Sequence, residues 1–173
     1  KINTGEFEIV YSSRSKPRFS FNGPFHSIDF NETAGISEFL DQVNPDIIIH
    51  AAGVTAIDYA AKNPEETIRV NVEATYEIVT WCRSKNARLI LFSTDFVFDG
   101  IAGSYSESDQ TAPISIYGKS KLQAEQTVIN RLTDFAIVRT SLVYGFNQNL
   151  ARLSFPVWLK ERLENGNAVD ITD

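Results

Sequence analysis

Tyr117 and Lys121 are the residues of this sequence whose types and spacing are best suited to proton transfer. On a helix, residues four positions apart share one face, so a phenol and an ammonium at these positions would lie side by side. The ammonium favours the phenolate and is expected to lower the pKa of the tyrosine from its reference value of about 10. Such a tyrosine could donate a proton to a carbonyl oxygen near neutral pH, although the same spacing also occurs in solvated helices without a catalytic role.

Thr94 lies where its hydroxyl could hydrogen-bond the same carbonyl oxygen. It follows the apolar segment 89–92, which is expected to form a strand, and ligands of open parallel sheets bind beyond the carboxyl ends of the strands. The tyrosine and the lysine fall in the segment 117–131, which is expected to form the next helix. The sequence therefore predicts Thr94, Tyr117 and Lys121 as catalytic residues.

A second group of candidate residues follows the apolar segment 46–50. Ala51, Ala52 and Gly53 have side chains small enough to let a flat or phosphate-bearing ligand approach the backbone. The alternative is that these residues only pack a tight turn, and the sequence leaves both interpretations open.

Strands and helices that alternate along the chain must position these residues. Strands are expected at 7–11, 27–30, 46–50, 89–92 and 135–138, and helices at 35–43, 64–83 and 117–131. The segments 46–50 and 89–92 are apolar without alternation, which is typical of parallel strands covered on both faces. The pattern predicts a doubly wound, Rossmann-like α/β fold, in which right-handed βαβ units place helices on both faces of a parallel sheet.

The composition argues against several classes of protein. The 173 residues include 16 Lys and Arg against 22 Asp and Glu, and the net charge of −6 argues against a nucleic-acid-binding surface. No apolar run approaches the roughly 20 residues of a membrane-spanning helix, so no membrane partner is expected. Cys82 is the single cysteine, which suits a reducing compartment such as the cytoplasm. His26 and His50 have no companions at metal-ligand spacing, so no metal site is expected.

Three motifs resemble those of one enzyme family. They are Ser-Thr-Asp-Phe-Val-Phe-Asp-Gly at 93–100, Tyr-Gly-Lys-Ser-Lys at 117–121 and Val-Arg-Thr-Ser-Leu-Val-Tyr-Gly at 138–145, with Ala-Pro at 112–113 between the first two. Together they make the chain similar to the dTDP-4-dehydrorhamnose reductases, which are extended short-chain dehydrogenases/reductases. The first motif is the most discriminating, because Tyr-x-x-x-Lys marks only the superfamily.

The resemblance implies an NADP(H)-dependent reduction of the 4-keto group of a nucleotide-linked deoxysugar, as in dTDP-rhamnose biosynthesis. It implies that Tyr117 is the general acid, that Lys121 holds the nicotinamide ribose and that Thr94 orients the keto oxygen. The residues that it places at the cofactor are Ser12, Arg14, Asp29, Ala51, Ala52, Gly53, Asn71, Ser93, Tyr117 and Lys121.

Three of these cofactor residues have a second interpretation. Asn71 matches a helix asparagine near the family's active site, and could instead be a surface residue. Asp29 resembles a strand-end acid near the adenine, and could equally cap a helix. Arg14 can pair with the 2′-phosphate of NADP, so NADP is expected with NAD as the alternative, unless Arg14 only belongs to a solvated basic loop.

The chain is expected to be a single domain, 1–173, that is incomplete at both ends. It contains no methionine, and the glycine-rich turn that precedes the second strand in this family is absent. The first strand and much of the substrate-binding region are therefore expected to be missing. Two positions also depart from the family pattern, because Phe96 stands where many members have tyrosine and Leu142 where many have tryptophan.

Two other functions occur among relatives with similar motifs. Some relatives are non-catalytic, NADP-binding regulatory subunits of methionine adenosyltransferase, and others are nucleotide-sugar epimerases or dehydratases. Intact Thr94, Tyr117 and Lys121 favour catalysis. A nucleotide sugar is the expected substrate, and a homodimer is an assembly that the resemblance allows.

Overall fold

The computed structural model describes residues 7–16, 21–141, 143 and 155–169. The chain divides into two compact units, of which the first contains residues 1–16 and 23–141 and the second contains residues 17–22 and 142–173. All the predicted site residues lie in the first unit.

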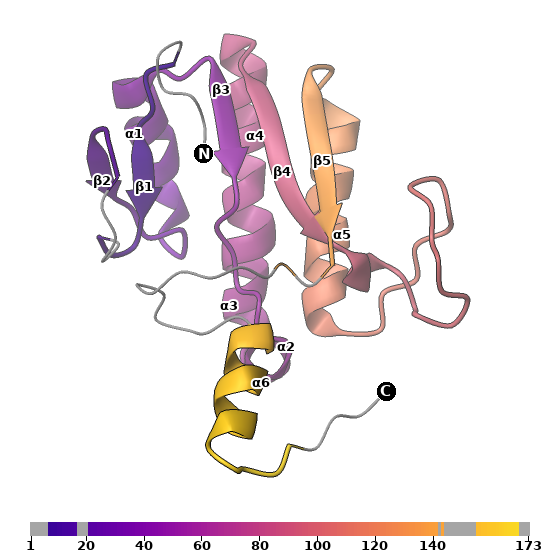
Figure 1. Cartoon of the computed structure of the whole chain (residues 1–173). Coiled ribbons are helices and arrows are strands. Elements are labelled where there is room, and N and C mark those ends of the chain that lie inside the picture. The colour runs from indigo at the N-terminus through magenta and orange to yellow at the C-terminus, as the bar shows by residue number, and fades with distance from the viewer. Residues whose placement is uncertain (1–6, 17–20, 142, 144–154, 170–173) are drawn as a thin grey trace. The chain divides into compact units, whose positions relative to one another are not determined.

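The first unit contains two parallel sheets (Figure 1). Strand β1 (Tyr11–Ser13) pairs with β2 (Phe25–Ser27) in one of them. The other has the order β3-β4-β5, formed by β3 (Ile47–His50), β4 (Arg88–Thr94) and β5 (Phe135–Thr140). The register pairs Thr94 with Thr140 at the carboxyl end of this sheet, which is the edge where the predicted catalytic residues were expected.

Helices connect the neighbouring parallel strands of the β3-β4-β5 sheet, which is the usual crossover for parallel pairing. Between β2 and β3 lie the short 3₁₀ helix η1 (Thr33–Gly35) and α1 (Ile36–Val43). The connection from β3 to β4 contains α2 (Ile57–Lys62), α3 (Pro64–Ile68), the π-helical turn η2 (Arg69–Glu73) and α4 (Ala74–Lys85). The connection from β4 to β5 contains the 3₁₀ turn η3 (Asp95–Val97) and α5 (Ile116–Arg131). The predicted α/β class with parallel strands and intervening helices is confirmed.

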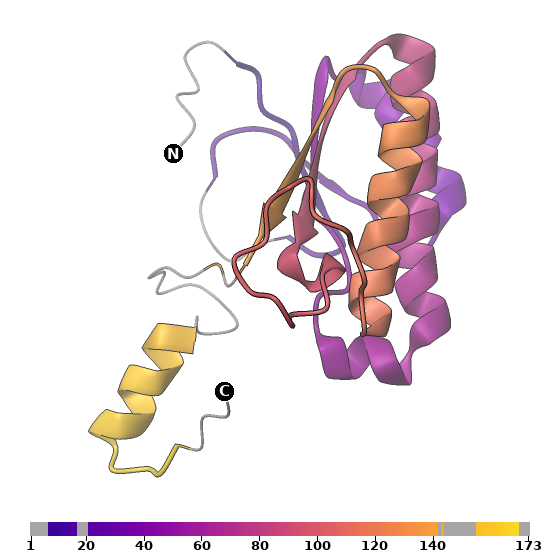
Figure 2. The ribbon, with the colours of Figure 1, turned by 90° about the vertical axis from the view of Figure 1, so that its right-hand side faces the viewer.

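One face of the strands carries the core of this unit. Helices α1, α4 and α5 lie against that face (Figure 2), and the buried cluster between the layers includes Ile36, Leu40, Val79, Leu89, Leu91 and Val128. On the strands β3, β4 and β5, exposed apolar side chains include Ile47, Ile49, Phe92 and Val138. The segment 46–50 was expected to be covered on both faces, but the described residues leave Ile47 and Ile49 about half exposed.

The first two strands differ from their predicted positions. β1 begins at Tyr11 rather than at residue 7, and the backbone N–H of Tyr11 donates to the carbonyl of Pro24 at 2.9 Å, where pairing with the β2 segment starts. β2 ends at Ser27, because a turn follows in which the backbone N–H of Asn31 donates to the Asp29 carboxylate at 2.9 Å. Apolar residues in 7–11 and 27–30 indicated strands near these places but not where pairing begins and ends.

The helix expected at 64–83 is present but is not uniform. Pro64 stands at its first turn, where a missing N–H costs no hydrogen bond. The π-helical turn then interrupts the α-helical hydrogen bonding, and the helix continues to Lys85. Asn86 ends it with a φ of 56°, the left-handed conformation that commonly closes helices. The sequence indicated this helix but not its π turn, and α2 was not predicted.

In the second unit, the structure describes α6 (Phe155–Glu164), which the sequence analysis did not predict. Lys160 and Glu164, one turn apart, form an exposed ion pair at 3.7 Å. Across the described residues of both units, none of the helices has the length and the apolar character needed to cross a bilayer.

Candidate functional site

The three predicted catalytic residues lie at the carboxyl end of β4 and on the first turns of α5. All three are buried, with 4% of Thr94, 9% of Tyr117 and 7% of Lys121 exposed. Thr94 Oγ1 donates to the Asp95 carboxylate at 3.1 Å and accepts the backbone N–H of Phe96 at 3.2 Å, and the Thr94 side chain is close enough to the Tyr117 phenol to influence its pKa. The structure therefore brings the threonine and the tyrosine together, and their catalytic roles stay predictions.

The start of α5 is fixed by local contacts that position Tyr117. Ser115 caps the helix by accepting a hydrogen bond from the backbone N–H of Gly118 at 3.0 Å. A Cβ atom at Gly118 would collide with the backbone carbonyl of Phe96, so only glycine lets the helix approach η3 this closely. The centroids of the Phe96 and Tyr117 rings lie 6.0 Å apart, so η3 also contacts α5 through these side chains.

Burial, rather than the neighbouring lysine, dominates the pKa of Tyr117. Burial raises the pKa of the phenol above its ordinary value, the nearby Thr94 side chain opposes this shift, and the negative charge of Asp95 adds to it. The expectation of a lowered pKa was wrong, because Lys121 is not among the groups that shift it in this structure. A phenol that stays protonated at neutral pH is nevertheless in the form that a general acid needs.

The Lys121 ammonium is also governed by burial. Desolvation lowers the pKa of Lys121 to about 8, and the carboxylate of Glu125, one turn further along α5, opposes the shift. The positive charge of Lys121 acts on His50, whose pKa is lowered to about 3, mainly by burial and secondly by this charge. His50 is therefore neutral, and the ammonium lies within electrostatic reach of the end of β3.

A network of hydrogen bonds centred on Asn71 joins α5 to the loop after β3. In the π turn, Asn71 Oδ1 accepts from the backbone N–H of Val54 at 2.8 Å, and Nδ2 donates to the Val54 carbonyl at 3.0 Å and to Ser120 Oγ at 2.9 Å. Ser120 Oγ in turn donates to the Tyr117 carbonyl at 2.7 Å. Asn71 is thus a buried member of the site, and the alternative of a surface residue is wrong.

Gly53 fits this network because it has no side chain. A Cβ atom there would lie 2.8 Å from Asn71 Oδ1, closer than a carbon and an oxygen can pack without displacement. The sequence analysis had given Gly53 a role beside a ligand or in a tight turn. The structure adds a third reason for glycine, which is the close approach of the asparagine.

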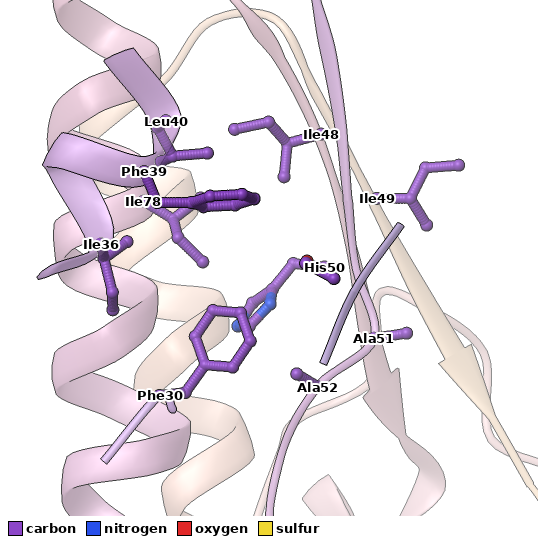
Figure 3. A pocket seen from close by; sticks show the side chains of 11 residues that line it. Phe30, Ile36, Phe39, Leu40, Ile48, Ile49, His50, Ala51, Ala52 and Ile78 are labelled. Atoms are coloured by element: carbon purple, nitrogen blue, oxygen red, sulfur yellow. The ribbon is translucent and has the colours of Figure 1, made fainter. Parts of the chain in front are cut away.

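A pocket lies between β1 and β3 (Figure 3). The predicted cofactor residues Ser12, Ala51 and Ala52 line it, and its other walls are largely apolar: Phe30, Ile36, Phe39, Leu40, Ile48, Ile49, His50 and Ile78. Figure 3 shows the Phe30 ring beside the imidazole of His50, and their centroids are 5.5 Å apart. The pocket reaches the carboxyl end of β3, where Ala51 and Ala52 leave the backbone accessible.

Ser93 is a buried hydroxyl with unused hydrogen-bonding capacity. Among the described residues, its Oγ atom has no hydrogen-bond partner, although only 4% of the residue is exposed. An unpartnered buried hydroxyl is costly to a fold unless another molecule supplies the partner.

Arg14 and Asp29 lie outside the lining of the pocket. Arg14 follows β1 and is exposed, and its carbonyl accepts a hydrogen bond from Ser27 Oγ at 2.9 Å. Asp29 accepts the backbone N–H of Asn31 in the turn after β2. Their roles at a cofactor stay predictions. Leu142 and the end of the third motif, 144–145, are outside the described residues.

Sequence reasoning missed Ser120, Thr75 and the part played by His50. Thr75 Oγ1 donates to the Asn71 carbonyl at 2.7 Å and lies 3.2 Å from His50 Nε2, so the network continues to the end of β3. Ser120 lies inside the Tyr-x-x-x-Lys segment, which is the signal that could have identified it. In the described residues, no three His, Cys, Asp or Glu side chains come together in a way that could hold a metal ion.

Comparison with known proteins extends this description. The sequence model of the RmlD substrate binding domain family matches residues 7–173. The chain is 36% identical over 154 residues to a probable low-salt glycan biosynthesis reductase of Haloferax volcanii, covering 88% of this chain and 51% of that protein. It is 36% identical over 138 residues to the dTDP-4-dehydrorhamnose reductase of Escherichia coli, covering 79% of this chain and 46% of that protein.

A third relative has a different name. Over 139 residues the chain is 30% identical to methionine adenosyltransferase 2 subunit beta of Xenopus tropicalis, covering 80% of this chain and 40% of that protein. The chain thus spans about half, or less, of the length of these curated relatives.

Solved structures resemble most of this chain. A hypothetical dTDP-4-dehydrorhamnose reductase from Sulfolobus tokodaii superposes with a TM-score of 0.82 at 28% identity, covering 96% of this chain and 57% of that one. A dTDP-4-dehydrorhamnose reductase from Bacillus anthracis, solved in complex with NADP, superposes with a TM-score of 0.76 at 25% identity, covering 90% of this chain and 59% of that one.

Proposed function

The chain belongs to the RmlD substrate binding domain family, and we propose that it forms the NADP(H)-binding and catalytic part of a reductase acting on the 4-keto group of a nucleotide-linked deoxysugar. The observation that carries the proposal is the position of the Tyr117 phenol. It is buried, protonated at neutral pH and close enough to Thr94 for that side chain to influence its pKa, and it lies on the same helix as the buried ammonium of Lys121.

The described residues fit a dinucleotide such as NADP. Small side chains, Ala51 and Ala52, border a pocket at a strand end, the Ser93 hydroxyl is buried without a partner, and Lys121 is a desolvated ammonium. Hydroxyl groups of a ribose are suitable partners for such a serine and such a lysine. NADPH, when bound, supplies the hydride for carbonyl reduction.

A cationic side chain favours NADPH over NADH. Arg14 is exposed directly after β1, two residues beyond Ser12 of the pocket lining. In dinucleotide-binding folds an arginine near this place accommodates the 2′-phosphate, whereas an acidic residue binds the ribose hydroxyl. The Bacillus anthracis structure with NADP supports the same choice, with NAD as the alternative.

The chain's own side chains would carry the proton transfer. Tyr117 donates its phenolic proton to the keto oxygen as that oxygen gains negative charge, so that the product is an alcohol. Thr94 donates a hydrogen bond to the same oxygen and orients it. Lys121, whose charge does not shift the pKa of Tyr117 here, would bind the hydroxyl groups of the nicotinamide ribose. Protons from solvent then restore the Tyr117 phenol.

A second candidate function is supported by the similarity to methionine adenosyltransferase 2 subunit beta. In that case the chain would hold NADP and contact a partner enzyme without turning over a substrate. A homodimer and a cytoplasmic location stay predictions from the sequence.

One assay separates the two candidates. The full-length protein is mixed with NADPH and a dTDP-4-keto-6-deoxy-L-sugar, and nicotinamide absorbance is followed, with the sugar omitted as the control. We expect NADPH to be consumed only when the sugar is present. NADPH binding without turnover, together with formation of a complex with methionine adenosyltransferase, would support the regulatory function instead.

A further inference from the structure

The segment between Thr94 and Tyr117 links the two residues that the proposed function places at the keto oxygen. After η3, residues 98–112, which we call the connector, leave the strand end and return to the start of α5. The backbone N–H of Ala112 donates to the Val97 carbonyl at 3.0 Å, which closes the base of the connector. Movement of the connector would therefore act on both ends of the Thr94–Tyr117 pair.

The connector has an aromatic centre of its own. The rings of Phe98 and Tyr105 stack with centroids 4.4 Å apart and planes 5° from parallel. The Tyr105 hydroxyl donates to the Asp99 carboxylate, which also accepts the backbone N–H of Ile101 at 3.0 Å. These contacts are within the connector and do not attach it to the rest of the unit.

Arg139 supplies that attachment. It lies on β5, in register with Ser93, and its Nε and Nη2 atoms donate to the two carboxylate oxygens of Glu125 at 3.0 and 2.7 Å. Its Nη1 atom donates to the Glu107 carbonyl at 3.2 Å, and its guanidinium lies 5.2 Å from the centre of the Phe98 ring. One side chain thus contacts α5, the connector backbone and the aromatic centre.

Glu125 makes this attachment rigid. Its side chain is fully buried, and it lies on α5 one turn beyond Lys121, so the guanidinium is tied to the same helix that carries Tyr117 and Lys121. A bidentate pair between arginine and a carboxylate fixes the plane of the guanidinium, whose central carbon lies 5.2 Å from the centre of the Phe98 ring. Lysine can replace the charge but cannot make these contacts together.

We propose that Arg139 is a positioning residue that fastens the connector to α5 and β5 and thereby holds Thr94 and Tyr117 at a common keto oxygen. The inference rests on the proposed function for its catalytic consequence. Arg139 is not placed at the substrate or the cofactor. It acts through Glu125, Phe98 and the Glu107 carbonyl.

The experiment compares Arg139→Gln and Arg139→Lys with Arg88→Gln in the full-length protein. Arg88 is a matched control, because it lies on the neighbouring strand and forms an exposed ion pair with Asp134 at 3.4 Å. Hydrogen exchange of the backbone amides is measured at residues 98–109 and, as a check of the fold, in β4. The kcat and KM of each protein are measured with the sugar nucleotide, a dTDP-4-keto-6-deoxy-L-sugar. The Kd of NADPH is measured by fluorescence.

In both Arg139 variants we expect the backbone amide hydrogens of the connector to exchange about tenfold or more faster than in the wild type. The exchange rates in β4 should be unchanged. Their kcat/KM for the sugar nucleotide should fall roughly 10- to 100-fold, because small misplacements of reacting groups are costly. The Kd of NADPH should stay at the wild-type value, and Arg88→Gln should behave as the wild type. A residue that acted only through its charge would be rescued by lysine, so normal kinetics in Arg139→Lys would overturn the proposal.

Two further results separate this inference from the proposed function. Unchanged exchange in Arg139→Gln, or fast exchange with an unchanged kcat/KM, would contradict the positioning role. A wild-type protein that turns over no sugar contradicts the proposed function, and the exchange rates then decide by themselves whether Arg139 holds the connector. Should Arg139→Gln fail to fold, Phe98→Leu tests the same attachment, since it removes the ring but keeps the pair with Glu125, and it should also speed exchange.

Discussion

At the scale of single residues, desolvation decides the charges in the site. Burial raises the pKa of the Tyr117 phenol and lowers that of the Lys121 ammonium to about 8. Both shifts favour neutral forms, so the folded protein holds a positive charge at Lys121 near neutral pH at a cost in stability. Such a cost is typical of groups that are arranged for chemistry rather than for folding.

The first prediction concerns that cost at Lys121. An unfolded lysine keeps its proton up to pH 10.5, whereas the buried one loses it near pH 8. Below pH 8 the lysine is charged in both states, but it is desolvated only in the folded one. At about 1.4 kcal/mol per pKa unit, this desolvation lowers the free energy of unfolding by about 3 kcal/mol. Between these pH values the unfolded state binds more protons, so wild-type stability gains with rising pH. Without cofactor, Lys121→Met should therefore be more stable at pH 7, and its advantage should vanish near pH 10.5.

Urea unfolding at pH 7, 9 and 10.5 measures this difference. Lys119→Met is the matched control, because Lys119 is exposed on the same helix and its replacement should change little. A Lys121→Met protein that is less stable than the wild type at pH 7 would show that the ammonium is stabilised by its surroundings.

Residue types and spacing predicted the positions of Thr94, Tyr117 and Lys121 at the strand end and on the helix better than the pKa values of these residues. The strand-end position of Thr94 and the i, i+4 spacing of Tyr117 and Lys121 depend only on local structure, which periodicity indicates. The pKa of Tyr117 depends on burial by distant parts of the chain, which spacing does not report. For the same reason the contact between Asn71 and Ser120 could not be foreseen, since 49 positions separate them.

At the scale of elements, the π turn η2 places Asn71 between two segments. It lets one amide side chain contact both the loop after β3 and the helix α5, which carries Tyr117 and Lys121. π turns inside helices are rare and are frequently found at functional sites. The sequence indicated a helix over 64–83 but not this turn, because apolar periodicity does not distinguish one extra residue in a turn.

The second prediction tests the fit between Gly53 and Asn71. Gly53→Ala would place a Cβ atom 2.8 Å from Asn71 Oδ1, so the amide must move and give up its hydrogen bonds to Val54. We expect the free energy of unfolding to fall by about 1–3 kcal/mol, as for other buried polar groups that lose their partners. Urea unfolding provides the measurement.

The matched control for this substitution is Gly35→Ala. A Cβ atom at Gly35 meets nothing within 4 Å, and its φ of −84° suits any residue. The free energy of unfolding of Gly35→Ala should stay within about 1 kcal/mol of the wild-type value. If Gly53→Ala were equally harmless, the close approach to Asn71 would not constrain the site.

At the scale of the whole molecule, charge balance bears on cofactor binding. The chain has a net charge of −6, which repels an anionic dinucleotide at long range. Binding then depends on local cations, and Arg14 next to the pocket is the candidate for the 2′-phosphate. Overall composition does not point to this cation, whereas its position after the first strand does, and its role stays a prediction.

The third prediction follows from that role of Arg14. Arg14→Glu should raise the Kd of NADPH roughly tenfold or more, because a charged hydrogen bond is lost and a repulsion is added, and should affect NADH much less. Arg83→Glu is the control for net charge, since Arg83 is exposed on α4. Fluorescence titration with both nucleotides checks this, and equal losses for NADPH and NADH would argue against a 2′-phosphate contact.

The fold class was the part of the whole molecule that could be predicted best. Alternation of apolar segments with amphipathic ones depends on local periodicity, and it predicted parallel strands with intervening helices, although not the observed order β3-β4-β5. The short strands β1 and β2 were displaced by a few residues, because three-residue strands carry too few apolar residues to mark their ends. The exposure of Ile47 and Ile49 could not be predicted either, since it depends on what packs against the sheet.

The measurement that tests the account most directly is the turnover of Tyr117→Phe beside Tyr59→Phe. Tyr59 is an exposed tyrosine whose hydroxyl donates to Glu66 at 2.7 Å, so its replacement controls for the loss of a hydroxyl. With NADPH and the dTDP-4-keto-6-deoxy-L-sugar, Tyr117→Phe should lose about 10²- to 10⁴-fold in kcat, with its Kd for NADPH unchanged, while Tyr59→Phe keeps full turnover. An unchanged kcat in Tyr117→Phe would contradict the proposal that this phenol protonates the keto oxygen.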